Sequence, residues 1–200
     1  MHRDPHFYRQ LIGWLWLAWG LYWMLRAVGA KRTARRESWL SRFAHVVPLS
    51  IGAILLGWRT LPWPWLAQRL WPRSFVVYCI GMVLLVAGLL FTVWAREHLG
   101  RNWSGTVTVK QDHELIRTGP YGYVRHPIYT GGLTAVLGTA LASGTVRAWL
   151  GFAIIAIALI RKLRIEERFM AETFPGSYAA YRAQVPALMP FTKPRRSAPR

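Results

Sequence analysis

The sequence predicts an all-α integral membrane protein with about five transmembrane helices. Hydrophobic residues make up 53% of the 200 residues, and they gather into runs along the whole chain. A helix needs about 20 mostly apolar residues to cross the core of a bilayer, and several runs approach that length. Such a composition is typical of a membrane protein rather than of a soluble domain with one buried core.

The apolar runs define the expected helices. They cover residues 8–28, 43–61, 75–95, 128–142 and 146–160. Only Ser143-Gly144-Thr145 separates the last two runs, which predicts a tight helical hairpin. The basic segment 31–36 follows the first run at once, and this pattern favours a retained membrane anchor over a cleaved signal peptide.

We expect two regions in the chain. Residues 1–95 form an N-terminal three-helix transmembrane region. Residues 96–200 hold a cytoplasmic loop, the hairpin at 128–160, a C-terminal helix and a basic tail. The polar residues that suggest chemistry lie in the second region.

The distribution of basic residues predicts the orientation in the membrane. The segment 31–42 carries five Lys or Arg residues, and short basic loops tend to stay in the cytoplasm. Five crossings then place the N-terminus outside and the C-terminus in the cytoplasm, although Arg69 and Arg73 in an outer loop weaken the contrast. The compact architecture and this charge pattern suit a bacterial inner membrane.

The formal net charge of +18 does not indicate nucleic-acid binding, because the basic residues lie between apolar runs and in the tail rather than along one helical face. Contact with anionic lipid of the bilayer explains the charge more simply. The single cysteine, Cys79, lies in an apolar run and cannot form an internal disulfide. No metal site is expected.

Two polar clusters interrupt the apolar pattern, at residues 119–129 and 161–168. The chain has only eight acidic residues, yet the second cluster contains two adjacent ones, Glu166 and Glu167. Ionisable groups at membrane boundaries are costly and by default indicate a functional site. If the hairpin folds back on itself, both clusters lie on the cytoplasmic side and form one polar site.

The start of the fourth helix has a suggestive local sequence. Pro127 suits the first turn, where its missing N–H costs nothing. His126 then lies near the N-cap, beside exposed backbone N–H groups and the positive helix end, which suits a carboxylate or a phosphate. Simpler interpretations stay open: Arg125 could snorkel, the tyrosines could form an interface belt, and Glu166 could pair with Lys162 on the helix surface.

The order of these motifs resembles the isoprenylcysteine carboxyl methyltransferase family and its bacterial relatives, which are also similar to the phospholipid methyltransferases. The resemblance covers roughly residues 99–191. It rests on Gly119-Pro120-Tyr121, Arg125-His126-Pro127-x-Tyr129, Glu166-Glu167, Tyr178-x-x-Tyr181, Pro186 and Met189-Pro190-Phe191.

The resemblance implies a membrane enzyme that uses S-adenosylmethionine, enclosed by the hairpin, the preceding loop and the C-terminal helix. Carried over by position, the cofactor-binding residues are His113, Glu114, Leu115, Ile116, Tyr121, His126, Pro127, Tyr129, Glu166 and Glu167. The chemistry of these residues suits this cofactor. A carboxylate can accept hydrogen bonds from its ammonium or its ribose hydroxyl groups, and tyrosine rings can attract its sulfonium. The Gly-x-Gly loop of soluble nucleotide-binding folds is absent from the sequence.

The methyl acceptor is expected to be a lipid-like or small hydrophobic molecule, and the carboxylate of a prenylcysteine-like molecule is one option. A carboxylate is already ionised and needs no base, whereas an amine or a thiol would need one, for which His98, His113 and Glu167 are available. In the family, an arginine one turn before the glutamate is expected to hold the substrate carboxylate. Here that position is Lys162, which lacks the bidentate fork of arginine. The candidate catalytic residues facing the acceptor are Lys162, Arg161 and Arg164.

Two other functions stay open. A membrane sterol-type reductase has a similar His-Pro-x-Tyr region but binds NADPH, and a non-enzymatic membrane scaffold would need no cofactor. Beyond the hairpin, apolar residues at broadly helical spacing predict a C-terminal lid that is bent at Pro175-Gly176. They are Ile165, Phe169, Phe174, Tyr178, Tyr181 and Val185.

Overall fold

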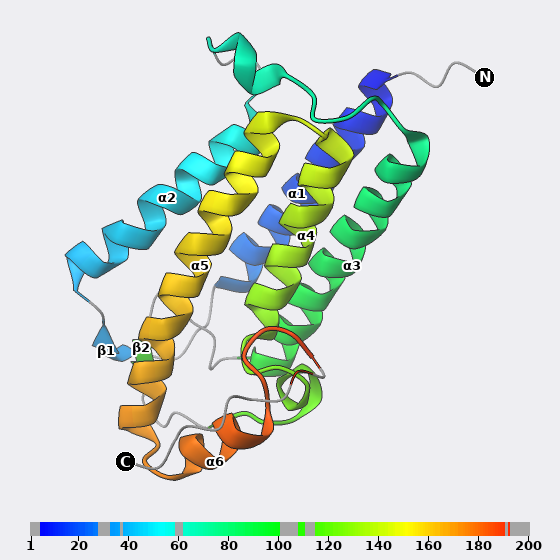
Figure 1. Cartoon of the computed structure of the whole chain (residues 1–200). Coiled ribbons are helices and arrows are strands. Elements are labelled where there is room, and N and C mark those ends of the chain that lie inside the picture. Colours follow the sequence, from blue (N-terminus) through cyan, green and yellow to red (C-terminus); the bar gives the residue numbers. More distant parts are fainter. Residues whose placement is uncertain are drawn as a thin grey trace.

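The computed structural model describes residues 5–27, 33–36, 38–58, 62–100, 108–110, 115–190 and 192. Its helices are α1 Pro5–Ala27, α2 Trp39–Gly57, α3 Phe75–Leu99, α4 Pro127–Ser143, α5 Val146–Thr173 and α6 Ser177–Gln184. Its short elements are the strands β1 Thr33–Arg36 and β2 Thr108–Lys110 and the 3-10 turns η1 Pro64–Ala67 and η3 Gly119–Gly122. Each predicted apolar run lies largely on one of the long helices α1 to α5, which run up and down along an elongated bundle (Figure 1).

Two closely packed helix pairs form the frame of the bundle. α3 packs along α4, and α2 packs along α5. A Cβ atom on Gly88 of α3 would lie 2.5 Å from the carbonyl oxygen of Gly131 on α4, and one on Gly52 of α2 would lie 2.9 Å from that of Gly151 on α5. Glycine at these positions therefore lets the helix backbones approach closely, as small residues do in membrane helix bundles.

The predicted hairpin between α4 and α5 is confirmed. Gly144 ends α4 in the left-handed conformation with φ of 62°, where a residue without a Cβ is favoured. The segment before α3 crosses over this turn, since Leu70 N donates to Gly144 O at 2.9 Å and Arg69 Nη1 donates to Ser143 O at 2.9 Å. The turn is thereby fixed at the end of the bundle opposite α6 (Figure 1).

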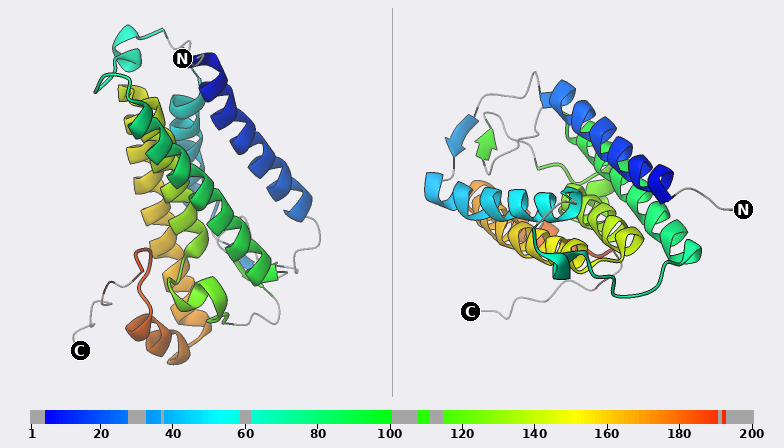
Figure 2. Two further views of the ribbon diagram at one scale, coloured as in Figure 1. Left: turned by 90° about the vertical axis from the view of Figure 1, so that its right-hand side faces the viewer. Right: turned by 90° about the horizontal axis from the view of Figure 1, so that it is seen from above.

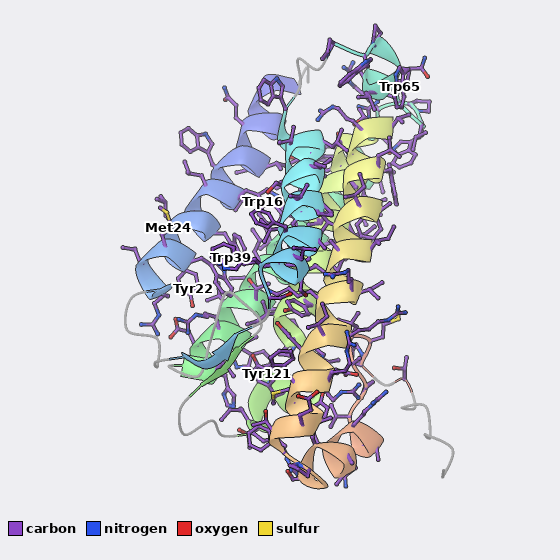
Figure 3. The ribbon with its side chains drawn as sticks, turned by 90° about the vertical axis from the view of Figure 1, so that its left-hand side faces the viewer. Trp16, Tyr22, Met24, Trp39, Trp65 and Tyr121 are labelled. Atoms are coloured by element: carbon purple, nitrogen blue, oxygen red, sulfur yellow. The ribbon has the colours of Figure 1, made fainter. Side chains whose placement is uncertain are left out.

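The first helix joins the frame through side chains. α1 lies along the outside of α3 in both views of Figure 2. Trp16 Nε1 donates to Thr139 Oγ1 at 3.0 Å, and Trp19 Nε1 donates to Thr92 Oγ1 at 2.7 Å. Figure 3 shows Trp16 directed from α1 toward the other helices. Hydrogen bonds donated by indole N–H groups thus attach α1 to α3 and α4.

The fifth helix is longer than predicted. The expected end at residue 160 is wrong, because α5 continues without a break to Thr173. The apolar run ends at residue 160, but the Arg, Lys and Glu residues that follow it are good helix formers and continue the helix. The predicted break at Pro175-Gly176 is confirmed and separates α5 from α6. Tyr178 and Tyr181 of α6 are buried, at 3% and 4% exposure.

A two-stranded antiparallel ribbon lies at the α6 end of the bundle. β1, from the connection between α1 and α2, pairs with β2, from the connection between α3 and α4. The ribbon is a small exception to the all-α prediction, and its two strands lie side by side (Figure 1).

Candidate functional site

The N-terminal end of α4 is covered by the segment that follows α6. Pro127 is the first helical residue and His126 is the N-cap, as predicted. However, Arg125 N donates to Pro186 O at 2.9 Å and His126 N donates to Ala187 O at 3.0 Å. The chain itself therefore supplies the acceptors of these two N–H groups, which lie just before the first turn of α4.

Arg125 connects three elements. Its Nε donates to Glu167 Oε1 at 2.9 Å, its Nη2 forms an ion pair with the same carboxylate, and its Nη1 donates to Val185 O. The residue is only 9% exposed. Arg125 therefore does not snorkel to the interface but joins the start of α4, the middle of α5 and the end of α6.

Tyr129 and His126 bring the two predicted clusters together. Tyr129 Oη on α4 donates to Glu166 Oε1 on α5 at 2.5 Å. His126 Nδ1 lies 3.7 Å from Glu166 Oε2, and its Nε2 lies 3.4 Å from Glu167 Oε1. The His126 and Tyr129 rings are stacked at 5.6 Å and nearly parallel. The hairpin thus places one histidine and one tyrosine beside both carboxylates.

The three basic residues proposed to face the acceptor, Arg161, Lys162 and Arg164, have different surroundings on α5. Lys162 Nζ lies 5.4 Å above the ring of Tyr129 and 3.9 Å from Glu166 Oε1. Arg161 Nη1 donates to Ser41 O on α2 at 3.1 Å, and Arg164 is exposed. The pairing of Lys162 with Glu166 exists, but it forms part of the cluster with Tyr129 rather than an isolated contact on the helix surface.

The turn η3 precedes this cluster in the sequence and is hydrogen-bonded to α6. Tyr121 is buried at 8% exposure, and its carbonyl oxygen accepts a hydrogen bond from Tyr181 Oη at 2.6 Å. Figure 3 labels Tyr121 in the half of the bundle that contains α6. Leu115 and Ile116 are half-buried. The predicted residues His113 and Glu114 lie outside the described residues.

The ion pair sets the charge state of Glu167. Burial raises its pKa, but the nearby His126 side chain, the hydrogen bonds from Arg125 and the charge of Arg125 outweigh burial and lower the pKa to about 2. In α6, burial raises the pKa of Tyr181 to about 12. Glu167 is therefore a permanent carboxylate at neutral pH, while the Tyr181 hydroxyl keeps its proton and can donate.

Sequence reasoning did not select some residues that build this site. Arg125 belongs to the motif with His126, but the sequence leaves open whether its side chain snorkels or has an internal partner. Thr130, whose Oγ1 donates to Leu188 O at 2.7 Å, carried no such signal. Its partner lies 58 residues away and contributes only a backbone carbonyl.

Residues 76–177 match the model of the phospholipid methyltransferase family. The chain belongs to this family. It also resembles protein-S-isoprenylcysteine O-methyltransferase of Schizosaccharomyces pombe, with 30% identity over 115 residues that cover 56% of this chain and 46% of the relative. A probable protein-S-isoprenylcysteine O-methyltransferase of Oryza sativa subsp. indica is 25% identical over 173 residues, which cover 85% and 88%.

A third relative has a different name. The cobalt-zinc-cadmium resistance protein CzcN of Cupriavidus metallidurans is 34% identical over 117 residues, covering 56% of this chain and 51% of the relative. The chain thus spans about half the length of several curated relatives. Among solved structures, the eukaryotic intramembrane Ras methyltransferase ICMT shares the fold, with a TM-score of 0.50 and 22% identity over 79% of this chain and 55% of that one.

The membrane character of the chain agrees with its family. Among the described residues, α2 and α3 are long and apolar enough to cross a membrane. Large apolar side chains of α2 face outward, with Trp39, Leu40 and Phe43 at 70%, 85% and 57% exposure. Such a surface is costly in water but suits lipid. The chain is an integral membrane protein.

Proposed function

We propose that the chain is a membrane methyltransferase that uses S-adenosylmethionine and methylates a lipid-like or small hydrophobic acceptor. The hydrogen bond between Tyr129 and Glu166 carries this proposal, because it joins the two family motifs across the hairpin. Membership of the phospholipid methyltransferase family and the names of the isoprenylcysteine methyltransferase relatives support the reaction type.

The residues of the cluster suit the chemical groups of this cofactor. The Glu166 carboxylate is partly exposed, at 23%, and can accept hydrogen bonds from an ammonium or a ribose hydroxyl. The Lys162 ammonium lies 5.4 Å from the centre of the Tyr129 ring, and this contact shows the affinity of the ring for a cation such as a sulfonium. His126 can donate to a carboxylate when protonated. The proposed cofactor site also includes His113, Glu114, Leu115, Ile116, Tyr121, Pro127 and Glu167.

When bound, S-adenosylmethionine supplies a methyl group activated by its sulfonium sulfur. Of the three basic candidates, Lys162 lies in the cluster and is the residue we assign to the acceptor. Its ammonium favours an anionic acceptor oxygen over a protonated amine, since like charges repel. A carboxylate, such as that of a prenylcysteine-like molecule, fits this role and needs no general base. Alignment and exclusion of water would then supply most of the rate.

The proposed membrane arrangement follows the helix directions. Helices α1 to α5 each cross the bilayer, residues 1–95 form the N-terminal three-helix region, and residues 96–200 carry the catalytic site. The site lies at the α6 end, which the basic segment 31–42 assigns to the cytoplasm. The N-terminus is then outside, and a bacterial inner membrane is the proposed location.

One ligand-binding assay separates this function from the alternatives. The detergent-solubilised protein is heated with S-adenosylhomocysteine or with NADPH, and its melting temperature is measured. Stabilisation by S-adenosylhomocysteine alone supports the methyltransferase. Stabilisation by NADPH alone would favour a reductase, and stabilisation by neither ligand would favour a scaffold. Methyl transfer to a panel of lipidic carboxylates, amines and thiols then identifies the acceptor class.

A further inference from the structure

The connection between α3 and α4 returns to the helix from which it leaves. It leaves α3 at Gly100, which caps the helix C-terminus. Among the described residues beyond it, Thr118 and Gly119 lie against His98, in the last turn of α3. The described residues at the two ends of the connection are therefore close together.

His98 makes three different contacts at this closing point. Its Nε2 lies 2.9 Å from Thr118 Oγ1, within hydrogen-bond distance. Its ring stacks on that of Tyr121, with the ring centres 6.3 Å apart and the planes 25° apart. A Cβ on Gly119 would lie 2.6 Å from His98 Cε1, and Gly119 has a φ of 58°. The imidazole thus occupies the space that a side chain at residue 119 would need.

The same turn is held from its other side by α6. Tyr181 Oη donates to Tyr121 O at 2.6 Å, and Arg117 Nη2 donates to Ser177 O at 3.0 Å. The turn η3 is therefore held between the last turn of α3 and α6. Tyr121 is a proposed cofactor residue. The position of its ring therefore depends on the contacts of η3 with both α3 and α6.

We infer that His98 is a positioning residue for the cofactor, which it serves by fixing the turn Gly119-Pro120-Tyr121 against the end of α3. The inference rests on the proposed function and extends it to a residue outside the motifs of the site. His98 acts through the stacked ring of Tyr121 and through its contacts with Thr118 and Gly119. Its effect should therefore be on cofactor affinity, with little effect on the stability of the helical frame.

The test measures the dissociation constant of S-adenosylhomocysteine by calorimetry and the melting temperature of the ligand-free protein. His98→Ala should weaken binding about tenfold, which corresponds to about 1.4 kcal/mol. The melting temperature should change little, because the His98 side chain is exposed at the end of α3. His98→Gln, which can still reach Thr118 with a flat amide group, should restore affinity to within about threefold of the wild type. Tyr123→Ala, an exposed side chain that follows the same turn, is the matched control and should leave affinity unchanged.

A double-mutant cycle tests the contact directly. Gly119→Ala should weaken binding because the new methyl group meets the imidazole and because φ is positive. Removing the imidazole as well relieves the first cause, so the loss in the double variant should be smaller than the sum of the two single losses. Additive losses, or wild-type affinity in His98→Ala, would overturn the inference while the proposed function stands. If the wild-type protein does not bind S-adenosylhomocysteine, the proposed function itself fails, and the inference fails with it.

Discussion

Tyr129 Oη donates to Glu166 Oε1 at 2.5 Å, from the first turn of α4 to the part of α5 beyond its apolar run. The two residues are 37 positions apart and meet because Gly144 reverses the chain between the helices. This contact makes the site a product of the hairpin rather than of either helix alone.

Glu166→Ala and His126→Ala should each abolish the thermal stabilisation by S-adenosylhomocysteine. Each change removes a polar group proposed to bind the cofactor, and neither residue lies at the close glycine contacts within the helix pairs. The ligand-free melting temperature should therefore stay close to that of the wild type. Tyr129→Phe is the intermediate case, since it loses the hydrogen bond but keeps the ring. Undiminished stabilisation in both the Glu166 and the His126 variants would refute the proposed site.

Lys162→Gln should separate binding of the cofactor from transfer. The change removes the ammonium proposed to hold the acceptor but leaves Tyr129 and Glu166 in place. We expect methyl transfer to fall at least about tenfold, while affinity for S-adenosylhomocysteine changes less than about threefold. Arg164→Gln removes a charge from the same helix at an exposed position and is the control. Equal losses in the two variants would argue for a general charge effect instead.

Arg125→Met should destabilise the protein strongly. It leaves the Glu167 carboxylate, whose side chain is 11% exposed, without its main partner. Breaking one side of a buried ion pair typically costs about 3–5 kcal/mol. The double variant Arg125→Met, Glu167→Leu removes both charges and should recover part of this loss. Thermal unfolding in detergent measures both effects, and a double variant less stable than Arg125→Met would contradict the assignment.

Glu167 also predicts a dependence of stability on pH. Its folded-state pKa of about 2 is below the usual value of 4.5, so its contribution is fully present above about pH 4.5. The contribution is lost as the pH falls from about 4.5 to about 2, because the unfolded chain takes up the proton first. The melting temperature of the wild type should therefore fall through this range. In Glu167→Gln it should fall less, and parallel curves for the two proteins would show that another group is responsible.

The helix pattern could be predicted well wherever the signal is local. The apolar runs gave the five long helices, Pro127 gave the start of α4, and Ser143-Gly144-Thr145 gave the hairpin turn. The end of α5 was missed because hydropathy reports the apolar part of a helix and not its hydrogen bonds. The charged residues after residue 160 continue the same helix.

The site could be predicted in part. The meeting of Tyr129, His126 and Glu166 followed from two motifs and the hairpin between them. Its long-range supports could not be read from the sequence. β1 pairs with a strand more than seventy residues away, and Pro186 and Ala187 contribute backbone carbonyl oxygens that any residue would offer.

The carbonyl groups of Pro186 and Ala187 are synthesised after the helices that they contact. Helices α4 and α5 leave the ribosome before residues 186–188, so at first the N–H groups of Arg125 and His126 have only water as a partner. The N-terminal end of α4 is therefore completed late in synthesis, when the following residues dock against it. A chain truncated before Pro186 would lack both acceptors and would leave this end of the hairpin unfinished.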